Sequence, residues 1–106
     1  MRDERRGSER KRLLLEAKCA SRSGKYEARV DDVSLSGCFV NTAWRVELNE
    51  VVSLEVQLPS GEWLPLRGHV ASYQPGVGFG VSFTSLSARE AAVLNDVISS
   101  TKEKLS

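Results

Sequence analysis

The sequence has no long hydrophobic run. No apolar stretch in its 106 residues approaches the roughly 20 residues that a helix needs to cross a bilayer. The charged first six residues are followed by no apolar segment of the kind that a signal peptide carries. We therefore expect no membrane insertion and a cytoplasmic location.

Cysteine and histidine are also scarce, with two and one residues respectively. Cys19 and Cys38 form no CxxC pair, and His69 cannot complete a usual zinc set with them. Both cysteines stand in apolar stretches, which favours small buried side chains over the alternatives of a disulfide or a metal site. A supported Ser-His-Asp or Cys-His set is missing, as is a phosphate-cradling GxxxxGK[ST] motif. The sequence predicts a protein that is not an enzyme and holds no metal or cofactor.

Charge of one sign does not dominate the chain. The net charge of +1 is too balanced for a general nucleic-acid binder, so we expect neither DNA nor RNA as a partner. The distribution is uneven, however. Residues 1–12 carry six basic and three acidic side chains, a local charge of +3, which leaves −2 for the rest of the chain. Most of this positive charge is arginine.

Hydrophobic residues alternate with polar ones over most of the chain, a period of two that predicts β-strands. In the fifth of these segments, Pro65 and Gly68 indicate a bulge or an edge. The expected strands cover residues 13–20, 25–33, 38–40, 51–58, 63–73 and 78–83.

The last part of the chain has a different pattern. Ser87 and Glu90 form a capping box, and apolar residues then recur at spacings of three and four, which predicts one helix over residues 88–104. We expect a mainly β fold: a small six-stranded antiparallel β-barrel (residues 13–86), preceded by a flexible arginine-rich arm (1–12). The C-terminal helix (87–106) would cover an open end, and the three parts would form one domain.

Two short motifs carry the chemistry. Arg6 and Arg10 form an RxxxR motif in the arm, and Asp32, Ser34 and Gly37 form a [D/N]xSxxG motif at the end of the second expected strand. Each motif alone is weak. Their order, their separation by one strand and the barrel-then-helix context together resemble the PilZ domain family. The segments around Leu58-Pro59, Gly68-His69-Val70 and 78–83 resemble it too, so the resemblance covers nearly the whole chain.

This resemblance implies a receptor for the bacterial second messenger cyclic di-GMP, which such domains commonly bind as an intercalated dimer. The implied ligand-binding residues are Arg6, Arg10, Asp32, Ser34 and Gly37, with Arg5 as an additional contact. Ligand binding would fold the arm onto the barrel, and a single domain would then signal through a partner protein that the sequence does not identify.

The residue types suit this ligand on chemical grounds. A guanidinium group can bond guanine O6 and N7 together, stack on a base or pair with a phosphate. Asp32 can accept from the guanine N1–H and amino groups, or orient an arginine of the arm. Ser34 can bond a base or a phosphate. At Gly37 the missing Cβ permits close approach of a ligand or of backbone, or a turn at positive φ.

Simpler interpretations stay open. The arm can be only a solubilising tail, and the second motif only a strand-ending turn. Asp31 and Asp32, as adjacent strand residues, should point to opposite faces and so form no acid–base pair. We expect Trp44, Trp63 and Tyr73 to be packing or rim residues rather than platforms for bases.

Two other functions compete with the leading one. The first is a PilZ-fold protein-interaction module without a nucleotide ligand; the intact motifs argue against it. The second is a small nucleic-acid-binding barrel that uses the arm as a phosphate clamp.

One departure from the family also matters: the spacer Gly7-Ser8-Glu9 replaces the apolar residue that often seats the arm. This spacer predicts a higher ordering cost and a modest affinity.

Overall fold

Six strands and one helix make up the computed structural model, which describes residues 13–105. The elements follow the predicted order closely, with differences of at most two residues at their ends. They are β1 (Leu15–Ser21), β2 (Gly24–Asp31), β3 (Gly37–Asn41), β4 (Val51–Gln57), β5 (Trp63–Gln74), β6 (Gly78–Phe83) and α1 (Ala88–Leu105).

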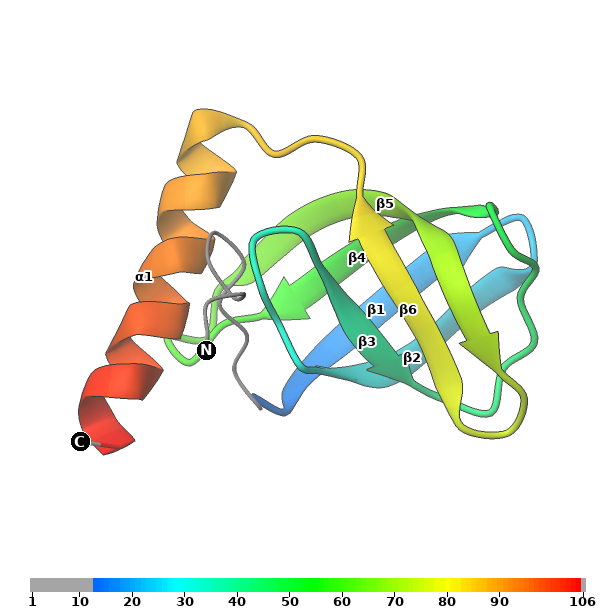
Figure 1. The fold of residues 1–106 in the computed structure, drawn as a ribbon, viewed down its shortest axis with the longest axis horizontal. Helices are drawn as coiled ribbons and strands as arrows, with labels where there is room; N and C mark the ends of the chain where they lie inside the picture. Colours follow the sequence, from blue (N-terminus) through cyan, green and yellow to red (C-terminus); the bar gives the residue numbers. More distant parts are fainter. Residues whose placement is uncertain (1–12, 106) are drawn as a thin grey trace, which may run out of the picture.

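The strands close into a barrel in the order β1-β2-β3-β6-β5-β4, and every neighbouring pair is antiparallel. Figure 1 shows the closed barrel with α1 lying beside one of its ends. Closure pairs β1 with β4 and so removes the exposed edges that an open sheet would present. The predicted six-stranded antiparallel barrel with a C-terminal helix is confirmed.

Alternation along the strands fills the barrel interior. In β4, Val52, Leu54 and Val56 are buried, whereas Ser53 and Glu55 between them are exposed. The same period of two in the other strands builds one core, because successive side chains point to opposite faces. That core is formed by Ala17, Cys19, Val30, Val33, Cys38, Val40, Val46, Val52, Leu54, Val56, Leu58, Leu64, Leu66, Val70, Phe79, Val81, Leu94 and Ile98.

Strand β5 corrects one detail of the sequence analysis. The irregularity lies between Val70 and Ser72, not at Pro65 or Gly68. The additional residue reverses the alternation, so that Tyr73 packs against the core as Val70 does. Pairing with β6 begins only at Gly68, so Pro65 lies where β5 has β4 as its one partner strand. The edge interpretation of Pro65 therefore holds, and the bulge interpretation was wrong.

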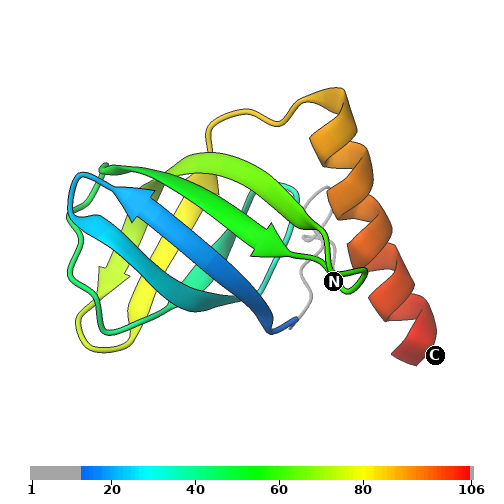
Figure 2. The ribbon, with the colours of Figure 1, turned by 180° about the vertical axis from the view of Figure 1, so that it is seen from behind.

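Helix α1 begins with the predicted capping box. The Glu90 amide donates to Ser87 Oγ at 3.0 Å, and the Ser87 amide donates to Glu90 Oε1 at 3.0 Å. One face of the helix then buries Leu94 and Ile98 in the core. Both views show the helix across the barrel end where β4 finishes and β6 leaves for the helix (Figures 1 and 2). The described residues include no helix that is both long enough and apolar enough to cross a membrane.

The two cysteines behave as small buried hydrophobic residues, as predicted. Both side chains lie in the core, and no disulfide joins them. Burial raises the pKa of the Cys19 thiol to about 11, since the charged thiolate would be poorly solvated there.

Candidate ligand-binding site

The second motif forms the connection between β2 and β3. β2 ends at Asp31 and β3 begins at Gly37, so residues 32–36 make the turn. This turn lies at the barrel end that faces α1 (Figure 1). Val33 is buried and anchors the turn in the core, while the amide of Phe83 donates to the Ser36 carbonyl at 2.9 Å. The turn is therefore held from inside the barrel and from β6.

Asp32 has a left-handed backbone, with φ of 54°. After glycine, asparagine and aspartate are the residues that adopt this conformation most readily. The backbone alone therefore explains an Asp or Asn at this position. The amide of Asp32 donates to Asp31 Oδ1 at 2.7 Å. Asp31 and Asp32 were expected to be adjacent strand residues. That expectation was wrong, because β2 ends at Asp31 and Asp32 is not a strand residue. The Asp32 side chain is half-buried at the surface of the turn.

Ser34 lies inside the turn. It has no exposed surface, and its Oγ accepts from the Ser36 amide at 3.1 Å and shares a hydrogen bond with Ser36 Oγ at 2.9 Å. The Ser34 amide donates to the Gly37 carbonyl at 2.9 Å. These bonds satisfy the buried hydroxyl and fix the shape of the turn. Ser36, two residues on, is exposed.

Gly37 is required by the approach of β6. A Cβ at this position would lie 2.0 Å from the carbonyl oxygen of Val81, and this oxygen belongs to backbone that cannot rotate away. Its φ is not positive, so the turn-conformation explanation does not apply. Of the reasons offered for this glycine, the structure shows close approach of backbone.

The structure thus brings Asp32, Ser34 and Gly37 together in one turn. The expected arm, with Arg5, Arg6 and Arg10, lies outside the described residues. Their contacts therefore stay a prediction, and the ligand-binding roles of the three motif residues likewise rest on the sequence.

The decisive comparison is with protein-family models. The model of the PilZ domain matches residues 4–100, a range that includes both motifs. This chain belongs to the PilZ domain family. A comparison with curated protein sequences gives no match.

Solved PilZ structures share the fold. The PilZ domain of CeSA from a cellulose-synthesizing bacterium has a TM-score of 0.70 at 18% identity, covering 89% of this chain and 98% of that one. The PilZ domain of YcgR from Escherichia coli, solved with c-di-GMP, has a TM-score of 0.71 at 13% identity, covering 96% and 98%. The Bacillus subtilis inhibitor of motility MotI/DgrA has a TM-score of 0.76 at 16% identity, covering 98% and 54%. The present PilZ domain therefore spans about half the length of MotI/DgrA.

A groove on another part of the PilZ barrel contains no motif residue. It has a volume of about 440 Å³ and lies along the outer side of β4 and β5, where Pro65 and Arg67 meet Ser87 and Glu90 of the helix start. Its lining mixes one arginine with two carboxylates, those of Glu55 and Glu90. It therefore offers no concentration of positive charge.

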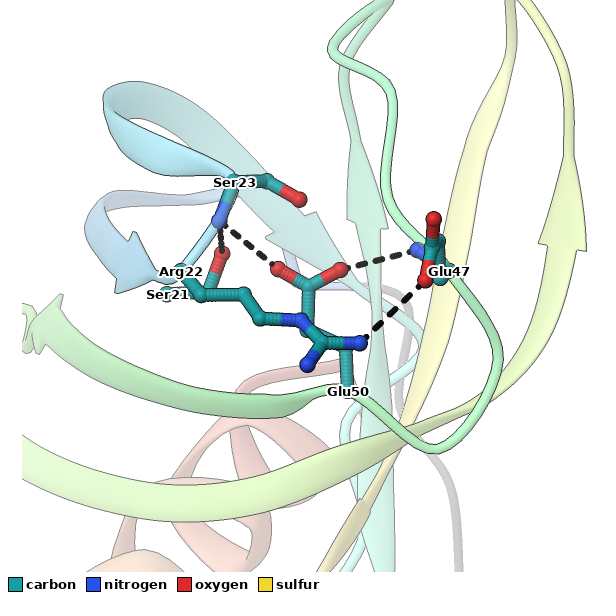
Figure 3. Close-up of polar contacts among 5 residues, drawn as sticks. All are labelled: Ser21, Arg22, Ser23, Glu47 and Glu50. Carbon is teal, nitrogen blue, oxygen red and sulfur yellow. Dashed lines mark hydrogen bonds and ion pairs between the residues drawn. The ribbon is translucent and has the colours of Figure 1, made fainter.

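A buried carboxylate, which the sequence analysis did not single out, lies at the opposite end of the barrel. Glu50 is 4% exposed, and its two oxygens accept from the amides of Ser23 at 3.0 Å and Glu47 at 2.8 Å (Figure 3). Burial by itself would raise the pKa of Glu50. Hydrogen bonds from the Ser21 and Ser23 side chains and from these amides outweigh it and lower the pKa to about 2.

These bonds tie the β1–β2 turn to the loop before β4. Their partners lie up to 27 positions apart, so no local sequence pattern marks them. The neighbouring Arg22–Glu47 ion pair, at 3.2 Å, is exposed on both sides and adds little. We interpret the cluster as structural.

Proposed function

We propose that this PilZ domain is an effector that binds cyclic di-GMP and passes the signal to another protein. The observation that carries the proposal is the presence of both motifs within the residues that the PilZ domain model matches, together with the left-handed turn that presents Asp32 at the barrel surface. The YcgR domain solved with c-di-GMP has the same fold, which supports the same ligand class here.

The arm and the turn divide the recognition between them. Arg5, Arg6 and Arg10 supply guanidinium groups for the guanine O6/N7 edge, for base faces and for the phosphates. Asp32 accepts from the guanine N1–H and amino groups that those arginines leave unpaired. The ligand can be taken up as an intercalated dimer, in which stacked bases offer several such edges.

Within the turn, Ser34 and Gly37 act chiefly through shape. The Ser34 hydroxyl is buried and bonded to Ser36, and Gly37 lets β3 lie against β6. Both residues stay in the proposed site, because the turn that they form sets where Asp32 and the exposed Ser36 lie. Loss of either should therefore disturb the turn before it removes a contact.

Signalling follows from ordering of the arm. Bound ligand would hold residues 1–12 against the barrel and change the surface that a partner protein meets. The cost of ordering the Gly7-Ser8-Glu9 spacer reduces the net affinity, so we expect binding in the micromolar range rather than far below it.

Isothermal titration calorimetry with cyclic di-GMP tests the proposal. R6A and R10A should each weaken binding by about 1–3 kcal/mol, the value of one bidentate guanine contact. R12A is the matched control, because it removes the same charge from the same arm outside the RxxxR motif. It should retain most of the affinity.

Two results would contradict the proposal and favour a different function. Absence of heat at micromolar cyclic di-GMP would favour the ligand-independent interaction module. Comparable binding of a short single-stranded RNA, with a steep salt dependence and equal losses in R6A and R12A, would favour the phosphate-clamp barrel.

A further inference from the structure

Phe39 is a large apolar side chain on the outside of the barrel. Its neighbours in β3, Cys38 and Val40, are buried in the core, so alternation directs Phe39 outward. It is half-buried, yet it is not among the described residues that form the core or pack against it. A phenylalanine in this position gains less from burial than one inside the barrel.

The other aromatic rings already have partners in the fold. Tyr26 stacks on Trp44 with ring centroids 4.7 Å apart and planes 15° apart, and Lys18 Nζ lies 4.5 Å from the ring centroid of Trp63. Phe79 is fully buried, and Tyr73 and Phe83 pack against the core. Trp44 and Tyr73 thus pack within the fold, and Trp63, at the surface, carries a cation on its ring.

A glycine in β6, Gly78, leaves room for the ring of Phe39. A Cβ on Gly78 would lie 2.8 Å from Cε2 and 3.1 Å from Cζ of Phe39, so the ring occupies the space of the missing side chain. Gly80 is the direct register partner of Phe39 and is itself half-buried. The Ser72 hydroxyl takes up the space at Gly80, 2.6 Å from where a Cβ would lie, so the ring lies low on the outer surface of β6 over Gly78.

This surface adjoins the motif turn. Phe39 comes two residues after Gly37, and its partner across β2 and β3 is Asp31. The Asp31 carboxylate in turn accepts the amide of Asp32. Directly paired residues on one face have Cβ atoms about 5 Å apart, so the ring and the acidic end of β2 share one surface.

We propose that Phe39 is the stacking platform for a guanine of cyclic di-GMP, an inference that rests on the proposed function. One base face lies on the ring, and the base edge then faces Asp32. Aromatic rings bind bases through such stacking without reading their sequence, and the acid and the arginines supply the selectivity for guanine.

The test compares a flat with a branched side chain at position 39. F39L keeps the apolar surface but removes the ring, and it should weaken cyclic di-GMP binding roughly tenfold in calorimetry, as expected for the loss of one base–aromatic contact. F39Y and F39W should retain most of the affinity. In F39W the added indole should also be quenched by bound guanine, beyond any change that Trp44 and Trp63 give in the wild-type domain.

Phe79 provides the matched control. F79L makes the same substitution at an aromatic residue that is fully buried in the core, and it should lower the melting temperature more than F39L does while leaving the affinity of the folded domain unchanged. This separates loss of the platform from loss of the fold.

Three outcomes overturn the inference. Wild-type affinity in F39L refutes the platform and leaves the proposed function standing. Equal losses in F39L and F39W, without quenching, show that the ring does not meet a base. Absence of binding in the wild-type domain refutes the function and the platform together.

Discussion

Two turns at opposite ends of β2 are each organised around a carboxylate, and they use it differently. At one end the carboxylate of Glu50 is 4% exposed and accepts two backbone amides that hold the β1–β2 turn. At the other end Asp32 lies half-buried at the surface in a left-handed conformation, and its amide donates to the neighbouring Asp31.

The difference separates a structural acid from a candidate recognition acid. Glu50 is surrounded by hydrogen-bond donors from the chain itself, so its carboxylate stabilises the fold. In the motif turn, Ser34 is the residue whose buried side chain makes the hydrogen bonds that hold the turn. The left-handed backbone places Asp32 at the surface. Substitutions at the first end should therefore change stability, and those at the second should change ligand binding.

Gly37 is the exception among the motif residues, because its substitution should change stability strongly although it belongs to the ligand-binding motif. G37A places a methyl group 2.0 Å from the backbone oxygen of Val81, and because β6 must move we expect a loss of about 3 kcal/mol or more. G80A is the control, since the atom that its Cβ meets is the Ser72 hydroxyl, which can rotate away. Urea denaturation of both variants checks this; equal stability would show that β3 and β6 can separate at little cost.

Removal of the buried acid should have the next largest effect. E50A leaves the amides of Ser23 and Glu47 without their acceptor, which should cost about 2–3 kcal/mol of unfolding free energy. E47A removes only the exposed ion pair with Arg22 and should cost no more than about 0.5 kcal/mol. Affinity for cyclic di-GMP should be unchanged in E50A below its melting temperature. A binding defect would break the comparison between the two ends.

Glu50 should also give the domain an acid-sensitive component of stability. Its pKa is lowered from 4.5 to about 2 on folding, so its contribution is fully present above pH 4.5 and is lost as the pH falls towards 2. E50Q lacks this titration. The stability difference between the wild type and E50Q should therefore shrink from pH 6 to pH 2 in denaturant titrations, whereas a constant difference would contradict the lowered pKa.

A smaller change in stability than for G37A or E50A is expected at Asp32. D32A forces an ordinary side chain to remain left-handed and should cost about 1 kcal/mol, whereas D32G should restore stability because glycine accepts this backbone. Both should lose ligand affinity, since both lack the carboxylate. Thermal unfolding and calorimetry on the pair separate the two roles, and normal affinity in D32G would remove Asp32 from the site.

Much of the fold could be predicted because its signals are local. The alternation in β4 and the capping box of Ser87 and Glu90 each depend on residues within a few positions of one another. The bulge between Val70 and Ser72 could not be placed, because it depends on the register between β5 and β6 rather than on Pro65 or Gly68. In the site, the motif pattern marked Asp32, Ser34 and Gly37, but burial of Ser34 and the contact at Gly37 appear only once β3 meets β6.

The sequence alone determined the strand and helix pattern, the two motifs and hence the family, because periodicity and spacing are properties of the chain. Tertiary structure decided which carboxylate is buried, which glycine another strand requires and which aromatic ring stays outside the core. Those outcomes depend on atoms brought together from distant positions, such as Ser23 and Glu50, which are 27 positions apart. Barrel closure sets these distances, and no short stretch of sequence encodes them.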